Sequence, residues 1–291
     1  MSRARTWTTV LTGGLAITAA LAACGSPPPP PAPPAPGAAA ARPDPRPTAE
    51  PVLTEVMGKL AEQSSVRTDI SGNLGLVGEL DAQGVVRYEG PRVDLAVDGA
   101  TQANQDTHPQ PVDLSMVDGV GYLKTPLAHP EPDKPWVKVV PGTQDFVGKL
   151  LSPALSQMHA AADPRTAFAG IEPATRVQSS TPEELRGTPT TRYELRVLTA
   201  EAAELAEDPQ QRERFRKAAD SGRAEFGYQL WLDEAGLPAK FAATQQVAQA
   251  GQVSLTSTYH DWGAPADIQP PPPEEIGVFR DAPMPQAQPP G

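Results

Sequence analysis

The chain has 291 residues, of which 35 are acidic and 24 are basic, and its formal net charge is −11. An acidic chain without a basic cluster disfavours nucleic acid as a partner and disfavours attachment to anionic lipid through a polybasic patch. The single cysteine, Cys24, excludes an internal disulfide. We therefore expect the apolar core alone to stabilise the fold.

The first 23 residues have the three parts of a secretory signal. Arg3 and Arg5 form a basic start, Val10 to Ala22 form an apolar centre, and small residues lead into Cys24. The apolar stretch is shorter than the ~20 residues that cross a bilayer. Removal of residues 1–23 would leave 22 basic and 35 acidic residues, a net charge of −13.

The residues Leu21-Ala-Ala-Cys24 resemble the bacterial lipoprotein signal. This resemblance implies cleavage before Cys24 and lipidation of its sulfur. Acyl chains such as palmitate would then hold the protein on the extracytoplasmic face of the cell membrane, and two or more chains anchor stably. An ordinary signal peptide and a core helix with a chance cysteine are the alternatives.

Two Pro-rich stretches flank the remaining chain. Residues 24–51 form a Pro/Ala-rich tether, and residues 269–291 form a tail. Both are poor in large apolar side chains, so we expect them to be disordered, although Ile276, Val278 and Phe279 could dock on the domain. Prolines favour an extended tether at ~3.1 Å per residue, which suits either a stalk or a tolerated linker.

The pattern between these stretches first indicates a helix and then strands. Residues 52–64 place Val52, Val56 and Leu60 on one helical stripe. Residues 67–140 alternate apolar and polar with period two, which predicts a meander of strands. The Asp118-Gly119 pair suits a tight hairpin turn.

Helical spacing returns over residues 145–161, where Pro153 predicts a kink or two short helices. We expect strands near 174–180 and 188–198, and then a charged helical segment over 200–219 that is interrupted at Asp208-Pro209. Three more strands follow near 224–233, 237–247 and 252–262. The hairpin-length connections predict an α+β fold with a mostly antiparallel sheet. The sequence has no second long apolar run, so we expect no transmembrane helix after the signal.

No catalytic or metal-binding motif stands out. The sequence lacks the motifs of common hydrolases and zinc proteins. His108, His129, His159 and His260 are far apart, and we interpret them as single surface residues, although Asp261 could form half of an acid/base pair with His260. Trp136, Trp231 and Trp262 fit core or rim packing better than ligand stacking. We predict no catalytic residue, no metal and no cofactor.

Several short motifs in one order resemble the LppX/LprG family of actinobacterial lipoproteins, which is related in shape to the LolA and LolB carriers. The motifs follow the signal, the tether and an amphipathic helix, and they are Gly119-Val-Gly-Tyr-Leu123, Pro135-Trp-Val-Lys-Val139, Arg186-Gly-Thr-Pro-Thr-Thr-Arg-Tyr193, Leu230-Trp-Leu-Asp-Glu-Ala-Gly-Leu-Pro238 and Tyr259-His-Asp-Trp-Gly263. The resemblance covers about residues 50–276. It implies a lipid-binding domain over residues 52–268 with a strongly curved antiparallel half-barrel, helices on its concave face and a hydrophobic cavity between them.

The family's ligands are lipids or acylated glycolipids, so the walls of such a cavity should be apolar. Candidate lining residues, for which ordinary core packing is the alternative, are Val56, Leu60, Leu95, Val97, Leu114, Met116, Phe146, Leu150, Leu151, Leu155 and Met158. We therefore predict a membrane-anchored lipid-binding lipoprotein that could transfer its ligand across the envelope. A solid-cored adaptor that binds another envelope protein is the main alternative, and an enzyme is the less favoured one.

Overall fold

The computed structural model describes residues 44–74, 78–90, 92–102, 108–126, 131, 133–140, 155–247 and 251–277. The signal segment, Cys24, most of the tether and residues 278–291 lie outside these ranges. Pro45–Gly291 forms one compact unit.

Within the described residues, twelve strands form a single open sheet in the order β12-β6-β5-β4-β3-β2-β1-β11-β10-β9-β8-β7. Neighbouring strands are antiparallel, except that β12 pairs with β6 in parallel. The strands are β1 (Ser65–Asn73), β2 (Glu79–Glu89), β3 (Arg92–Gln102), β4 (Gln110–Val117), β5 (Val120–Lys124), β6 (Trp136–Val139), β7 (Thr175–Leu185), β8 (Thr188–Leu198), β9 (Glu225–Asp233), β10 (Pro238–Val247), β11 (Gly251–His260) and β12 (Ile276–Gly277).

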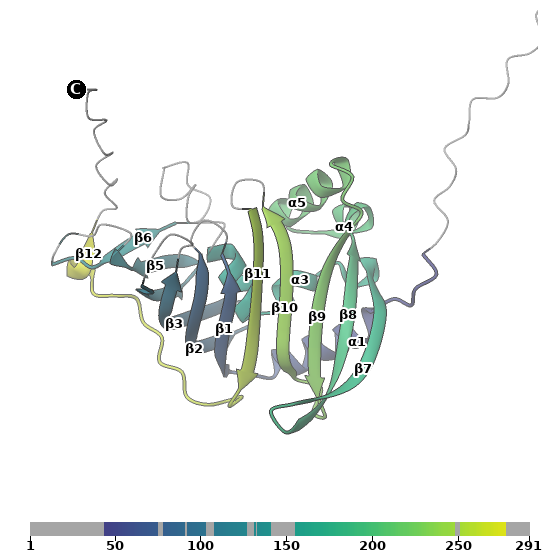
Figure 1. Cartoon of the computed structure of the whole chain (residues 1–291), viewed down its shortest axis with the longest axis horizontal. Coiled ribbons are helices and arrows are strands. Elements are labelled where there is room, and N and C mark those ends of the chain that lie inside the picture. The colour runs from purple at the N-terminus through teal and green to yellow at the C-terminus, as the bar shows by residue number, and fades with distance from the viewer. Residues whose placement is uncertain are drawn as a thin grey trace, which may run out of the picture. The chain divides into compact units, whose positions relative to one another are not determined.

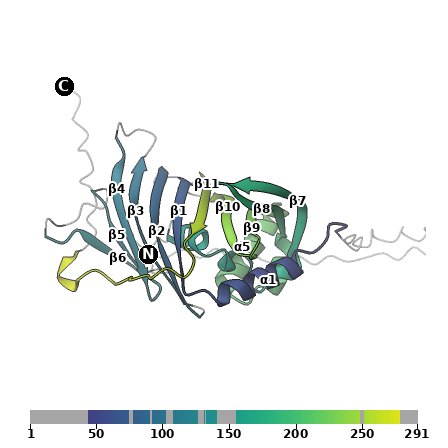
Figure 2. The same cartoon turned by 90° about the horizontal axis from the view of Figure 1, so that it is seen from below.

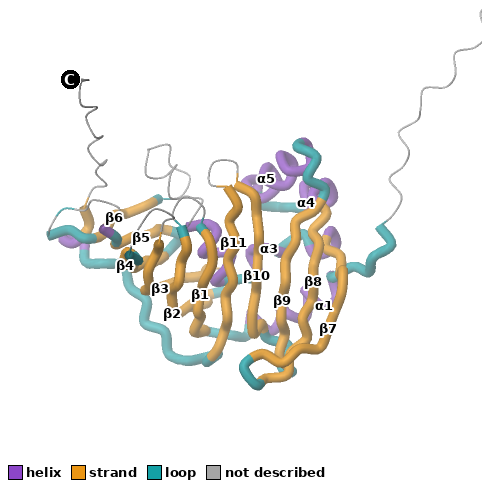
Figure 3. The backbone as a smooth tube through the Cα atoms, in the orientation of Figure 1, coloured by secondary structure: helices purple, strands orange, loops and turns teal. Residues whose placement is uncertain are grey.

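The helices complete an α+β fold, as predicted. They are α1 (Glu50–Ala61), a helical segment over 155–162, α3 (Arg165–Phe168), α4 (Thr199–Leu205) and α5 (Pro209–Asp220), with short 3₁₀ turns at Glu172–Ala174 and Pro273–Glu275. Figures 1 and 3 view the sheet with α1 and α3 behind it, and Figure 2 shows the sheet bending around the helices. We call the face toward the helices the concave face and the opposite face the outer face. None of the described helices is both long and apolar enough to cross a membrane.

Side-chain alternation explains which face of each strand is buried. In β1, Val66, Thr68 and Ile70 are buried on the concave face, whereas Arg67 and Ser71 are exposed on the outer face. The same alternation continues through the paired strands because the register matches buried positions with buried positions. The concave face therefore carries one continuous apolar core.

Two glycines allow neighbouring strands to approach closely where the sheet bends. A Cβ atom on Gly84 would lie 2.2 Å from the carbonyl oxygen of Ala96, and one on Gly99 would lie 2.2 Å from the carbonyl oxygen of Asp81. A side chain at either position would therefore force the strands apart. Glycines of this kind permit local curvature in a sheet.

The structure confirms the predicted hairpin turn at Asp118-Gly119 and the predicted interruption of the charged helical segment at Asp208-Pro209. Asp118 (φ 53°) and Gly119 (φ 74°) form the tight turn between Val117 and Val120, with the two positive φ angles of a type I′ hairpin. Asp208 caps α5, because its carboxylate accepts hydrogen bonds from the backbone amides of the next two non-proline residues. The charged helical segment is therefore two helices, α4 and α5.

One long segment on the outer face does not follow from the sequence pattern. After β11 the chain crosses that face and ends in β12, and we call Ala264–Gly277 the outer strap. Ile268 is buried at 1% exposure, and Ile276 pairs with Trp136 of β6. The first nine residues of the predicted tail, 269–277, thus belong to this strap, while Val278 and Phe279 lie outside the described residues.

Candidate functional site

The predicted lining residues that the structure describes are all buried in the concave-face core. They are Val56, Leu60, Leu95, Val97, Leu114, Met116, Leu155 and Met158. Phe146, Leu150 and Leu151 lie outside the described residues. The role of the set as cavity lining, rather than as filled core, stays a prediction.

These residues fall into two groups along the sheet. Leu95 pairs with Met116 and Val97 pairs with Leu114 on β3 and β4. Leu155 packs over the same region, since a Cβ atom on Gly121 of β5 would lie 2.7 Å from its Cδ1. Helix α1, with Val56 and Leu60, lies instead behind the half of the sheet that contains β7 to β10 (Figures 1 and 2). The two groups are connected through the rest of the core.

Small side chains occupy the middle of the concave face between the two groups. Five positions on four strands form what we call the central patch, with the fully buried Ile70 between Ser257 and Ala82: Thr68, Ala82, Gly84, Gly99 and Ser257. Thr68 is opposite Gly84, and Ala82 is opposite Gly99, while Ser257 lies across from Ile70. The sequence search missed this patch because it selected large apolar residues. The glycines and the alanine at inward-facing positions of the predicted strands could have indicated the patch.

The patch and its surroundings carry buried hydroxyl groups. Thr68 is fully buried, and its Oγ1 has no hydrogen-bond partner among the described residues. The Oη of Tyr88 is likewise buried without a described partner. The Tyr259 hydroxyl donates to the carbonyl oxygen of Ala161 on the helical segment. An unsatisfied buried hydroxyl is costly, so such a group favours a ligand or water that can bond to it.

A polar and aromatic cluster lies beside the helical segment. The Arg165 Nε donates to Asp163 Oδ1 at 2.9 Å, and the Arg165 guanidinium lies 4.7 Å from the ring centre of Tyr88. Trp262 stacks on Tyr88 with ring centres 6.3 Å apart. Trp262 is thus a packing residue of this cluster, as the sequence favoured.

Burial perturbs three ionisable groups of this region. Desolvation, reinforced by the charge of Asp163, raises the pKa of Tyr88 far above its ordinary value, although Arg165 opposes the shift. Burial also raises the pKa of Tyr259. Desolvation lowers the pKa of His159, against the opposing effect of Asp163. Both tyrosines therefore stay neutral donors, and His159 favours its neutral form.

The remaining candidates for chemistry do not converge. His159 is partly buried beside Asp163, so it is not the surface residue that the sequence suggested, and His129 lies outside the described residues. His260 Nδ1 lies 3.1 Å from Asp261 Oδ2 on the outer surface, so the predicted pair forms in space but contacts no described nucleophile. Within the described ranges, no three His, Cys, Asp or Glu side chains are grouped to hold a metal ion.

No protein-family model matches the chain, and no curated protein matches it. Similar solved structures include LprF from Mycobacterium bovis, with 14% identity, a TM-score of 0.43 and coverage of 77% of this chain and 96% of that one. The MucA/MucB complex of Pseudomonas aeruginosa matches with 16% identity and a TM-score of 0.33, and the match covers 75% of this chain and 59% of that one. A DUF1329 family protein from Desulfovibrio piger matches with 8% identity and a TM-score of 0.28, and the match covers 74% of this chain and 92% of that one.

Proposed function

We propose that this chain is a lipid-anchored protein of the extracytoplasmic membrane face that holds the acyl part of a lipid or glycolipid against its concave face, for transfer across the envelope. The observation that carries the proposal is the central patch, where five small residues replace the large side chains expected at inward positions. We infer that these small side chains leave room for an acyl chain between the bent sheet and its helices, among the apolar side chains of the core.

Hydrophobic transfer supplies the driving force for such binding. Each buried methylene contributes about 0.8 kcal/mol, so a sixteen-carbon chain resists entering water by roughly 12 kcal/mol. The unpartnered hydroxyls of Thr68 and Tyr88 are donors for an ester or headgroup oxygen at the buried end of the ligand. The proposed site therefore combines apolar walls with a small number of polar groups, as ligand pockets generally do.

The start of the folded unit supports a tethered arrangement. The last residues of the predicted tether are ordered, contrary to expectation, because they pair with β7: the Val177 amide donates to the Pro47 carbonyl at 2.9 Å, and the Ala49 amide donates to the Thr175 carbonyl at 2.8 Å. Arg46 also forms an ion pair with Glu225 on β9. We propose that Cys24 carries the lipid anchor and that residues 24–44, at a reach of roughly 65 Å if extended, place the domain away from the membrane.

The test measures lipid carried by the protein purified from its own membrane. Organic extraction and native mass spectrometry should detect a bound lipid in addition to the covalent acyl chains. Ala82→Leu should reduce that lipid severalfold by filling the central patch, whereas Ala100→Leu, on the outer face of the neighbouring strand, should not. Protein without extractable lipid, or equal lipid in both variants, would contradict the proposal.

A further inference from the structure

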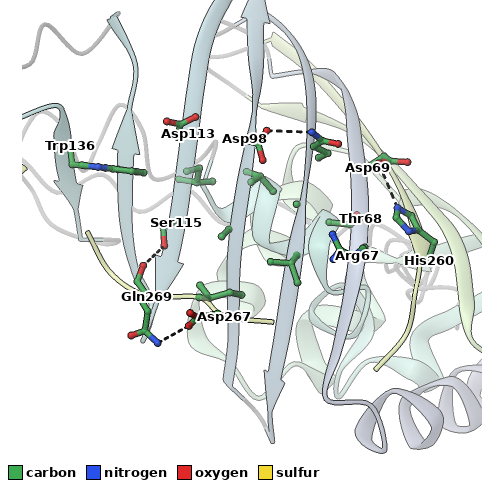
Figure 4. A pocket seen from close by; sticks show the side chains of 17 residues that line it. Arg67, Thr68, Asp69, Asp98, Asp113, Ser115, Trp136, His260, Asp267 and Gln269 are labelled. Atoms are coloured by element: carbon green, nitrogen blue, oxygen red, sulfur yellow. Dashed lines mark hydrogen bonds and ion pairs between the residues drawn. The ribbon is translucent and has the colours of Figure 1, made fainter. Parts of the chain in front are cut away.

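The outer face of the sheet carries a groove that the proposed acyl site does not use. It has a volume of about 540 Å³ and crosses β1, β2, β3 and β4, with the outer strap along one side and Trp136 of β6 at one end (Figure 4). The side chains of Asp98 and Asp113 point into it, and they alternate along their strands with Val97 and Leu114 of the concave core. The groove and the acyl site are therefore on opposite faces of the same strands.

The outer strap forms a fixed wall of this groove. At its start, Ser65 donates its hydroxyl to the carbonyl oxygen of Ala264. In the middle, Ser115 Oγ donates to the carbonyl oxygen of Gln269 at 3.4 Å, and Ile268 is buried against the sheet. At its end, the strap pairs with β6 as β12. A wall attached at three places keeps the lining groups in position before a ligand arrives, which favours binding.

Each carboxylate in the groove already has a donor. Asp69 pairs with Arg186 at 3.2 Å, and Asp113 pairs with Lys124 at 3.0 Å. The other two accept from glutamine amides: Asp98 from Gln83 at 3.4 Å, and Asp267 from Gln269 at 3.1 Å. Lys124, Arg186 and the lining residue Arg67 together balance most of the negative charge of the four carboxylates. The groove therefore has little net charge to attract a polycation, although four of its lining residues are acidic.

The same carboxylates can still accept hydrogen bonds from a neutral polar ligand. A carboxylate has about four lone-pair sites, so each can accept a hydroxyl proton while keeping its present donor. Arg67, Gln83 and Ser115 add donors, and Val85 with Ala96 forms an apolar floor. The indole of Trp136, only half-buried, lies at the end of the groove (Figure 4). The Lys124 ammonium lies 5.7 Å from its ring centre, so the rest of the ring is the apolar surface offered to a ligand.

From this combination we propose that the outer groove binds a neutral oligosaccharide. Sugars present several hydroxyls that both donate and accept, together with C–H faces that pack on an aromatic ring, and the groove offers a complement to each. Its volume lies within the roughly 300–1,000 Å³ of small-molecule sites. The ligand needs no acyl chain, so the inference goes beyond the proposed function and does not depend on it.

The experiment uses the full chain purified from its membrane in a detergent without a sugar headgroup, because such headgroups would compete. Saturation-transfer NMR is measured with maltotriose, α-mannotriose and cellotriose at millimolar concentration. We expect at least one trisaccharide to receive saturation from the protein. Tryptophan fluorescence gives its affinity in the wild-type chain.

Variants then locate the binding site. Trp136→Ala and Asp98→Ala should each weaken the affinity tenfold or more, as measured by NMR titration. Asp81→Ala is the matched control, because Asp81 is an exposed carboxylate on the same face of β2 outside the groove, and it should leave the affinity unchanged. Circular dichroism should show the same fold for all three variants.

Three outcomes would overturn the proposal. The first is the absence of saturation transfer to all three sugars. The second is sugar binding that Trp136→Ala and Asp98→Ala leave unchanged, which would place the sugar elsewhere. The third is binding of spermine or an oligolysine peptide that depends on Asp98 while the sugars fail, which would identify a cation site. Extractable lipid is measured in the same preparations, so failure here stays distinct from failure of the acyl site.

Discussion

Replacement of Thr68 by valine tests the central patch directly, because it removes one hydroxyl while almost preserving the side-chain volume. Thr68 is 0% exposed, and its Oγ1 lacks a partner within the described part of the chain. A buried hydroxyl without a hydrogen bond costs about 1–3 kcal/mol relative to its hydration in the unfolded chain. Valine also suits a strand at least as well as threonine. Thr68→Val should therefore stabilise the lipid-free protein by about 1–2 kcal/mol.

Urea unfolding of delipidated protein, followed by circular dichroism, measures this change. Thr258→Val is the matched control, since Thr258 lies on the outer face of the adjacent strand β11 and is partly exposed. Its free energy of unfolding should change by less than about 0.5 kcal/mol. Destabilisation of Thr68→Val by 1 kcal/mol or more would refute the reasoning. It would show that Oγ1 bonds to a buried water or another group, so that the patch holds no free donor.

Substitutions at four further positions test the packing and the electrostatics. Phe168→Ala, which removes a fully buried ring packed edge-on against two other aromatic rings, should cost about 3–5 kcal/mol in urea unfolding. Asp208→Ala should cost about 0.5–2 kcal/mol through the lost cap of α5, and Asp208→Asn should restore most of it. Burial holds the pKa of His159 below its ordinary 6.5, so the unfolded chain binds protons more readily than the folded protein, and the folded state loses stability as the pH falls below 6.5. His159→Gln should flatten this pH dependence of the unfolding free energy. An unchanged slope would contradict the assignment. Burial raises the pKa of Tyr88 above its ordinary 10.0, so stability should fall as the pH rises past 10, and Tyr88→Phe should reduce that loss in alkaline thermal melts.

The strands were predictable because alternation is a local signal that the sheet preserves. β3 carries Leu95 and Val97 inward with Ala96 and Asp98 outward, and the paired strands repeat this pattern in register. The turn at Asp118-Gly119 was also readable, since few residue pairs accept positive φ twice in succession. Local signals of this kind act within a few residues and require no knowledge of the tertiary structure.

The outer strap was not predictable, because tertiary contacts rather than local pattern hold it in place. The prolines of the strap are typical of a disordered tail, and Ile268 is one isolated apolar residue among polar neighbours. That residue is buried beside the outer groove, whose lining also includes Val85 and Ala96 on a face that alternation marks as polar. Helix α3, with four residues, is similarly too short to give a periodic signal.

The two candidate sites escaped the sequence for a shared physical reason. A search for apolar residues finds what fills a core, whereas the central patch is defined by side chains that are small, such as Ala82 and Gly99. The outer groove is defined by polar residues such as Asp98 that normally mark a solvated strand face. In both cases residues from neighbouring strands or from the strap come together only after the chain has folded. A strand that alternates between the two faces can therefore contribute to both sites at once, and substitutions at adjacent positions of β3 should separate lipid binding from sugar binding.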